Sequence, residues 1–401
     1  MAGFASGSRR LAWVGAALVG CGGDGGHSHK DAAATAADTA QAEASSDTSS
    51  TDASTEASAE TAIEVAVSGC SADDLAACEY PSKGLTATVR EGLATTDPVT
   101  GRVLPLLARI PAVTGPAPVV IWSHGGGFSD DGHHHSEAWG KLLAAHGFVV
   151  IHVAHATLNQ TTGAKLCELA LVPPAECVAG DDEDATGLLA VARALDLAAV
   201  LDDLPRLSQV SVNNGGPALD LDHVALSGWS GGSRGPMVLM GATVKPTASA
   251  PIFAKTHARV AAAFIMSPTG PGFGGFSADG ATSSWDAMRG PFYMATGEND
   301  VKPLKPELDG PVRRQPFDEQ PGDGKRWLLY SNLDVGVGGH ATFNLEDTGS
   351  SDARLARLTK SIGSVARAFL DSSLRGDADA AAWLARDDAK ILAGDVEWSH
   401  R

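Results

Sequence analysis

One short motif has the residue types and spacing that nucleophilic catalysis requires. Residues 228–232 read Gly-Trp-Ser-Gly-Gly, a G-x-S-x-G pattern between an expected strand at 223–226 and an expected helix at 235–242. Such a pattern holds its serine in a strained turn, where a Cβ two positions away would collide with neighbouring backbone. The motif therefore predicts a nucleophile elbow with Ser230 as the attacking group, and a simple glycine-rich turn is the alternative.

A second glycine-rich segment has the composition of an oxyanion hole. Acyl transfer develops negative charge on a carbonyl oxygen, which backbone N–H groups must stabilise. His124 and the three glycines at 125–127 directly follow an expected strand, which is typical of an HGGG-type oxyanion turn. We assign one donor to the N–H of Gly231 and the other to Gly126 or Gly127. His124 itself is interpreted as a structural brace.

A serine nucleophile also needs a histidine base and an acid that orients the base. When the serine lies in a G-x-S-x-G elbow, the acid comes next along the chain and the histidine comes last. Asp300 follows an expected strand, and His340 is the only histidine between Asp300 and the expected closing helix. The sequence therefore predicts a triad of Ser230, Asp300 and His340, with Glu298 as the rival acid.

The elements that must position these residues follow an alternating pattern. Short apolar runs alternate with segments of helical periodicity, which predicts an α/β fold with a mostly parallel central sheet flanked by helices. Strands are expected at 85–90, 102–110, 118–123, 149–153, 223–226, 260–267, 292–296 and 326–331, and helices at 136–146, 183–204, 235–242 and 353–374. The connection 158–182 is expected to lack regular structure.

From about residue 101 onward, the chain resembles secreted α/β-hydrolases of the dienelactone hydrolase and platelet-activating-factor acetylhydrolase-like group. The resemblance lies in residues 123–127, 221–232, 267–272, 297–303 and 368–371. It implies an α/β-hydrolase fold, a cofactor-free esterase or lipase-like activity, and the same roles for Ser230, Asp300 and His340. Many relatives have an acid and a proline where this chain has His-Val-Ala-His-Ala-Thr at 152–157, so no pocket detail is transferred.

The beginning of the chain has the pattern of an export signal. Arg9 and Arg10 precede an apolar run at 11–20 that is too short to span a bilayer, so residues 1–20 are interpreted as a cleaved signal peptide. Leu-Val-Gly-Cys at 18–21 resembles the bacterial lipobox, with Cys21 as the lipidated residue; an ordinary signal peptide is the alternative. We expect export and lipid anchoring to the bacterial cell envelope, with inner or outer membrane left open.

Composition divides the rest of the chain into a tether and one large domain. Residues 21–62 are acidic and rich in Ala and Ser/Thr, which predicts a disordered tether. Residues 63–401 are long enough for a single catalytic domain. The net charge of −18 and the lack of a basic stripe argue against nucleic-acid binding. The expected substrate is a small-molecule or lipid-like carboxylic ester, and the triad requires no metal or organic cofactor.

Two other functions remain open at this point. An amidase or peptidase can use the same triad, and a hydrolase fold can serve as a non-catalytic surface binding module. The pattern G-x-G-x-x-G at 270–275 is interpreted as a loop and not as a dinucleotide site, because it contains Pro271 and the run at 276–284 that follows it has the composition of a loop. The acids and histidines at 130–135 are interpreted as a polar loop, because consecutive residues seldom converge on one metal ion.

The cysteines predict two local disulfides. With Cys21 lipidated, four cysteines remain, and we pair Cys70 with Cys78 and Cys167 with Cys177 because exported proteins fold where thiols oxidise and each pair is close in sequence. The second bridge is expected to stiffen an apolar flap at 168–176 beside Ser230. A surface staple unrelated to substrate is the alternative.

Overall fold

The computed structural model describes residues 69–177, 187–278, 283–301, 310–320, 325–333, 338–346 and 351–401. All of these residues belong to one compact unit, Ile63–Arg401. The predicted signal peptide, Cys21 and the predicted tether lie outside the described residues.

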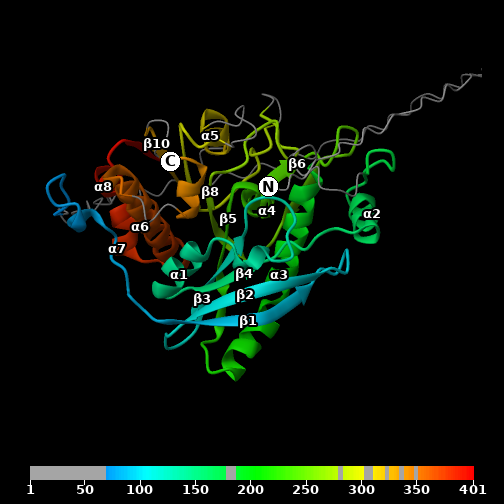
Figure 1. The fold of residues 1–401 in the computed structure, drawn as a ribbon, viewed down its shortest axis with the longest axis horizontal. Helices are drawn as coiled ribbons and strands as arrows, with labels where there is room; N and C mark the ends of the chain where they lie inside the picture. Colours follow the sequence, from blue (N-terminus) through cyan, green and yellow to red (C-terminus); the bar gives the residue numbers. More distant parts are fainter. Residues whose placement is uncertain are drawn as a thin grey trace, which may run out of the picture. The chain divides into compact units, whose positions relative to one another are not determined.

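Within the described residues, nine strands form one sheet in the order β1-β2-β4-β3-β5-β8-β9-β10-β11. Figure 1 shows β1 and β2 at one side of the molecule and β10 at the other. The strands are β1 Ala87–Thr96, β2 Val103–Pro111, β3 Ala117–Ser123, β4 Val149–Val153, β5 Leu219–Trp229, β8 Val260–Met266, β9 Phe292–Gly297, β10 Arg326–Ser331 and β11 Val396–His400. All neighbours from β4 to β10 pair in parallel. The antiparallel pairs involve β1, β2 and β11. The predicted α/β class with a mostly parallel sheet is therefore confirmed.

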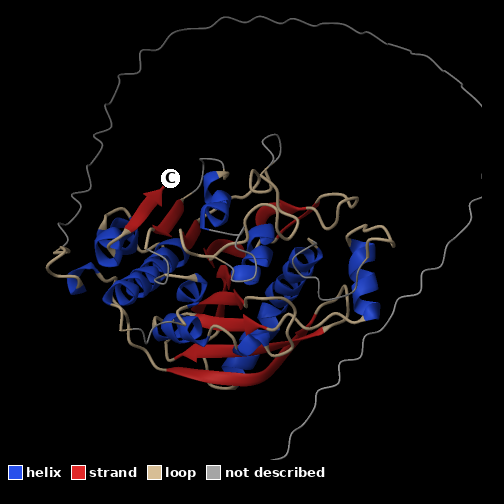
Figure 2. Ribbon diagram, turned by 45° about the horizontal axis from the view of Figure 1, so that its top comes forward, coloured by secondary structure: helices blue, strands red, loops and turns tan. Residues whose placement is uncertain are grey.

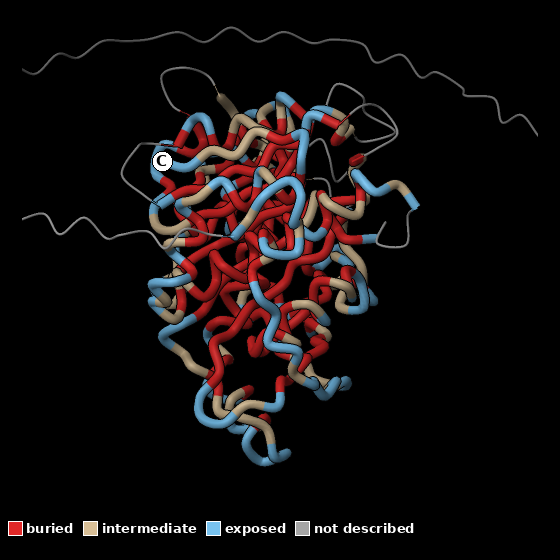
Figure 3. Tube along the Cα trace, turned by 90° about the vertical axis from the view of Figure 1, so that its left-hand side faces the viewer, coloured by how far each residue is buried: buried red, intermediate tan, exposed pale blue. Residues whose placement is uncertain are grey.

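The central strands are buried on both faces, which explains why their sequences are continuous apolar runs. Every residue of β3, β4, β9 and β10 is buried. In β3, Val119 and Ile121 enter one hydrophobic core, whereas Val120 and Trp122 enter the other. Figure 3 shows the buried chain concentrated in the interior, with exposed segments around it.

Helices cover both faces of the sheet (Figure 2). One core includes side chains of α2 Gln160–Leu169, α3 Leu188–Asn213, α4 Arg234–Leu239 and α5 Gly310–Asp318. The other core includes side chains of α1 Glu137–Ala145, α6 Ala353–Arg375, α7 Ala378–Leu384 and α8 Asp388–Ala393. A separate hairpin, β6 Met240–Val244 and β7 Phe253–Thr256, follows α4.

The predicted ends of two helices and the predicted lack of structure in one connection were wrong. The long helix was expected to stop before Pro205, but α3 continues to Asn213 because its buried face continues through Leu207 and Ser211. The helix expected at 235–242 ends at Leu239, where the chain turns directly into β6. The connection 158–182 contains α2, which begins with a capping box between Asn159 and Thr162.

The structure contains both predicted disulfides, Cys70–Cys78 and Cys167–Cys177. The second bridge joins the last turn of α2 to the segment that follows it. Leu171 in that segment is 68% exposed. The Glu176 carboxylate accepts a hydrogen bond from the N–H of Ser249, which lies between β6 and β7. The bridged segment therefore contacts the hairpin, and its predicted role as a flap beside Ser230 stays a prediction.

Candidate active site

The strand-to-helix turn after β5 has the strain that the motif predicts. The strand ends at Trp229, the 3-10 helix η3 covers Ser230–Ser233, and α4 begins at Arg234. Ser230 has a φ of 54°, in the left-handed region that side chains other than glycine avoid. Such a backbone costs about 1–3 kcal/mol and persists only where the surrounding structure fixes it. Ser230 is thus held at a sharp turn that presents its side chain beyond the end of the sheet.

Close backbone packing explains the glycines of the motif. A Cβ on Gly228 would lie 2.2 Å from the carbonyl oxygen of Gly232. A Cβ on Gly232 would lie 2.1 Å from the carbonyl oxygen of Ser123. A Cβ on Gly231 would lie 2.3 Å from the carbonyl oxygen of Gly126. The elbow therefore packs directly against the glycine-rich loop after β3, and no larger residue fits at these three positions without backbone movement.

Ser230, His340 and Asp300 form a continuous hydrogen-bonded chain. The Nε2 atom of His340 is 2.8 Å from Ser230 Oγ, and its Nδ1 atom is 2.6 Å from Asp300 Oδ1. His340 begins the 3-10 helix η4, His340–Asn344, and Asp300 lies just beyond β9. With Nδ1–H donating to the carboxylate, Nε2 is free to accept the serine proton. The structure thus brings together three side chains that are far apart in sequence.

The rival acid lies elsewhere. Glu298 is exposed, and its carboxylate accepts a hydrogen bond of 2.6 Å from the Tyr330 hydroxyl. Asp300, by contrast, is fully buried and contacts the imidazole of His340. The geometry favours Asp300 as the group that orients the histidine.

The surroundings of Asp300 keep its carboxylate ionised. Burial by itself raises the pKa of Asp300, but the Arg313 guanidinium and the His340 hydrogen bond outweigh burial and lower the pKa below its ordinary value. Arg313 comes from α5, and its Nε lies 3.3 Å from Asp300 Oδ1. Thr296 donates a hydrogen bond of 2.7 Å to the other carboxylate oxygen. An anion in this position would favour positive charge on the neighbouring imidazole.

Trp229 connects the elbow to the histidine and to the glycine-rich loop. Its indole Nε1 donates a hydrogen bond of 3.1 Å to the carbonyl oxygen of His340, and the two ring centroids are 4.7 Å apart. A Cβ on Gly125 would lie 2.3 Å from the Trp229 ring. Trp229, which precedes Ser230, therefore contacts both His340 and the glycine-rich loop.

His124 braces that loop as predicted. Its Nδ1 donates to the carbonyl oxygen of Gly125 at 2.7 Å, and its Nε2 accepts from the N–H of His155 at 3.3 Å. Burial, together with the charge of Arg193, lowers the pKa of His124 to about 2, so the ring is neutral. In a trans peptide the C=O and N–H point in opposite directions, so the N–H of Gly126 points away from the His124 ring.

Gly126 lies beside Gly231, as two neighbouring oxyanion donors require. The Gly126 nitrogen is 3.4 Å from the position that a Cβ on Gly231 would occupy. Gly126 also has a φ of 73°, which favours glycine. The predicted alternative donor, Gly127, is held by its carbonyl oxygen through a hydrogen bond of 2.7 Å from Arg193.

Arg193, which was not predicted from the sequence, fixes the glycine-rich loop through hydrogen bonds to its carbonyl oxygens. Its fully buried guanidinium donates to the carbonyl oxygens of His124 (2.6 Å), Gly126 (2.7 Å) and Gly127 (2.7 Å), and to Ser123 Oγ at 3.0 Å. A buried charge is tolerated only when hydrogen bonds replace its hydration. The signal was present in the sequence, because Arg193 and Asp196 interrupt the otherwise apolar run 188–201.

A second serine, histidine and aspartate chain lies beneath the loop. Ser123 Oγ is 2.8 Å from His155 Nε2, and His155 Nδ1 is 2.9 Å from Asp196 Oδ2. All three side chains are fully buried. Arg193 also donates to Ser123 Oγ, and burial lowers the pKa of His155 well below its ordinary value. This chain supports the loop from the interior, without the exposure that a nucleophile needs.

Two other segments considered from the sequence were compared with the geometry that each site needs, within the described residues. Residues 270–275 lie in turns that follow β8, without the helix that a dinucleotide site requires. In the described part of the chain, no group of three or more His, Cys, Asp or Glu residues has the arrangement to hold a metal ion. No helix among the described residues has the length and apolar character needed to cross a membrane.

No protein-family model and no curated protein sequence matches the chain.

Mild acid is expected to destabilise the fold. Burial lowers the pKa of His124 to about 2 and that of His152 to about 3. Below about pH 6.5 these two histidines therefore bind protons in the unfolded chain but stay neutral in the folded chain. Their contribution to the free energy of unfolding falls as a result. Each of the two histidines should remove about 2 kcal/mol between pH 7 and pH 5.

Urea unfolding at these two pH values measures the effect. His223→Gln is the control for substituting a histidine outside the core, because the His223 side chain is 48% exposed. Asp196, whose pKa burial raises to about 7, takes up a proton over the same range and opposes the histidines. A free energy of unfolding that is higher at pH 5 than at pH 7 would contradict the neutral state of the buried rings.

Proposed function

We propose that the chain is a serine hydrolase with an α/β-hydrolase fold that cleaves carboxylic esters. The observation that carries the proposal is the hydrogen-bonded chain from Ser230 through His340 to Asp300, built on a nucleophile with a φ of 54°. Ser230 Oγ bonds to the ester carbonyl carbon while its proton moves to His340 Nε2. That proton then leaves with the alcohol, and water, deprotonated by His340, releases the acid from the acyl-enzyme.

The placement of the three residues in the sheet supports the fold assignment. Ser230 follows β5, Asp300 follows β9 and His340 comes after β10, and these strands belong to the parallel part of the sheet. In open parallel sheets ligands bind beyond the carboxyl ends of the strands. The chain order of serine, acid and histidine is that of α/β-hydrolases. It agrees with the resemblance to the dienelactone hydrolase and platelet-activating-factor acetylhydrolase-like group.

The oxyanion donors in this proposal are the N–H groups of Gly231 and Gly126. Their backbones are in contact, and the loop that carries Gly126 is fixed by the Arg193 guanidinium. Fixed donors stabilise the charge that develops in the transition state without reorganising during the reaction. Gly127 stays the alternative second donor.

We also propose that the protein is exported and lipid-anchored to the cell envelope. Two disulfides favour a compartment where thiols oxidise. In this proposal Cys21 carries the lipid, and residues 21–62 separate the membrane from the enzyme.

Ser230→Ala and His340→Ala should lower ester turnover by about 10⁴-fold or more, because the two side chains act as one unit. The measurement is a series of chromogenic esters of increasing acyl length, with anilides of the same acids beside them. Turnover of anilides but not of esters would replace the esterase with an amidase. An absence of Ser230-dependent turnover on every substrate would favour a binding module instead.

The two acids provide a matched comparison. Asp300→Asn should cost about 10⁴-fold in kcat because the His340 tautomer is no longer fixed. Glu298→Gln, two residues away, should change kcat little because Glu298 contacts Tyr330. A larger loss from Glu298→Gln than from Asp300→Asn would show that the acid assignment is wrong.

Arg193→Lys tests the positioning of the oxyanion loop. A lysine keeps the charge but not the planar fork that reaches several carbonyl oxygens. We expect kcat to fall at least tenfold with little change in KM, because the oxyanion forms only in the transition state. Arg206→Lys, on the same helix and exposed, is the control for folding and activity. An Arg193→Lys enzyme that folds and retains its kcat would contradict this role.

Cys21→Ser tests the anchor. The variant should lose membrane association and retain its ester kcat/KM, because the proposed anchor and the catalytic residues lie in separate parts of the chain. Fractionation of cells that express either form measures the difference. Membrane association that survives the substitution would rule out the lipobox.

A further inference from the structure

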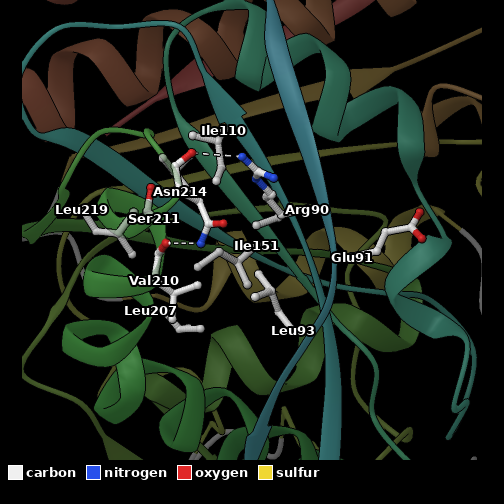
Figure 4. A pocket seen from close by; sticks show the side chains of 12 residues that line it. Arg90, Glu91, Leu93, Ile110, Ile151, Leu207, Val210, Ser211, Asn214 and Leu219 are labelled. Carbon is white, nitrogen blue, oxygen red and sulfur yellow. Dashed lines mark hydrogen bonds between the residues drawn. The ribbon is translucent and has the colours of Figure 1, made fainter.

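A cavity of about 190 Å³ lies between the sheet and the last turns of α3 (Figure 4). Its walls are mainly apolar, with Leu93, Ile110, Ile151, Leu207 and Leu219 among the lining residues. An apolar cavity of about 150 Å³ in another protein binds benzene. The cavity is therefore large enough for an apolar group of about that size.

The cavity lies at the opposite end of the strands from Ser230. It is lined by Val149 and Leu219, the first residues of β4 and β5. Ser230 follows the last residue of β5, which is 11 residues long. Leu219 pairs with Ala117 and Gly228 pairs with Ser123, the two ends of the seven-residue β3, because β5 is irregular between Asp220 and Val224. At about 3.3 Å per residue the two ends of β5 are therefore roughly 20 Å apart. The cavity is thus separate from the proposed catalytic site.

An irregularity in β1 places the positively charged side chain of Arg90 beside this cavity. Arg90 pairs with Ala108 and Leu93 pairs with Leu106, so three steps along β1 match two along β2. Gly92, within the irregularity, has a φ of 70°. Residues an odd number of positions apart normally point to opposite faces of a sheet, and a bulge re-aims them. Both Arg90 and Leu93 therefore line the cavity.

The Arg90 charge is not neutralised by a carboxylate within the described part of the chain. Its Nη2 donates to the carbonyl oxygen of Asn214 at 3.0 Å, and the Asn214 side chain donates to the carbonyl oxygen of Val210 at 2.7 Å. Glu91 also lines the cavity, but Figure 4 shows its side chain well apart from the Arg90 guanidinium. A guanidinium beside an apolar cavity suits a ligand with an apolar body and an anionic end.

We propose that this cavity binds a monocarboxylate whose apolar part is about the size of a benzene ring, with its carboxylate on Arg90. The proposal does not depend on the catalytic role of Ser230.

Titration calorimetry of the full chain with benzoate, and with benzamide as its neutral isostere, tests the proposal. Benzoate should bind with a Kd of about 1 mM or lower, and benzamide at least tenfold more weakly. Arg90→Gln should weaken benzoate binding at least tenfold. Arg206→Gln is the matched control, because Arg206 also joins α3 to β1, through a hydrogen bond of 2.7 Å to the Ala94 carbonyl oxygen. It does not line this cavity.

Val210→Trp provides a second test that does not alter charge. Val210 is a partly exposed lining residue, and an indole in its place should fill the space and abolish benzoate binding. Thermal melts establish that each variant is folded. An absence of benzoate binding to the wild-type chain, equal binding of benzoate and benzamide, or benzoate binding that survives both Arg90→Gln and Val210→Trp would overturn the proposal. None of these measurements uses ester turnover, so their outcome is independent of the proposed function.

Discussion

The buried guanidinium of Arg193 is the interaction on which the candidate site depends. It donates to three carbonyl oxygens of the glycine-rich loop and to Ser123, all within 3.0 Å. Removing such hydrogen bonds would leave a charge in a medium that cannot hydrate it, at a cost of several kcal/mol. The loop therefore cannot move away from α3 without a large penalty. These hydrogen bonds hold the glycine-rich loop at 125–127 in a single backbone conformation.

The fixed loop in turn determines the elbow. The carbonyl oxygens of Ser123 and Gly126 lie where a Cβ on Gly232 or Gly231 would be, so the two turns fit together only through glycine. Ser230 stays in its left-handed conformation because the chain on both sides of it is packed in this way. Trp229 then extends the same packing to His340. Packing contacts between α3, the glycine-rich loop, the elbow and η4 thus hold the strained backbone of Ser230 in place.

The parts of this arrangement that follow from local chemistry could be predicted. Strands buried on both faces appear as apolar runs, and the strand ends together with the order of serine, acid and histidine select Asp300 and His340. Arg193 was missed because helical periodicity gives the buried face of a helix but not the acceptors that meet it. The extent of α3 was wrong because Pro205 ends an isolated helix, whereas tertiary packing of Leu207 carries this one further. The role of Arg313 depends on a contact between α5 and Asp300 that no local pattern encodes.

The central claim is that Ser230 is an activated nucleophile, and covalent labelling tests it most directly. A 4-nitrophenyl alkylphosphonate reacts with such a serine: Oγ bonds to phosphorus, the serine proton passes to His340, and nitrophenolate leaves. Peptide mass mapping of the labelled protein identifies the modified residue. We predict a single equivalent of nitrophenolate, a phosphonyl group on Ser230, and loss of labelling in His340→Ala. Labelling of another residue such as Ser123, or no labelling in the wild-type chain, would contradict the claim.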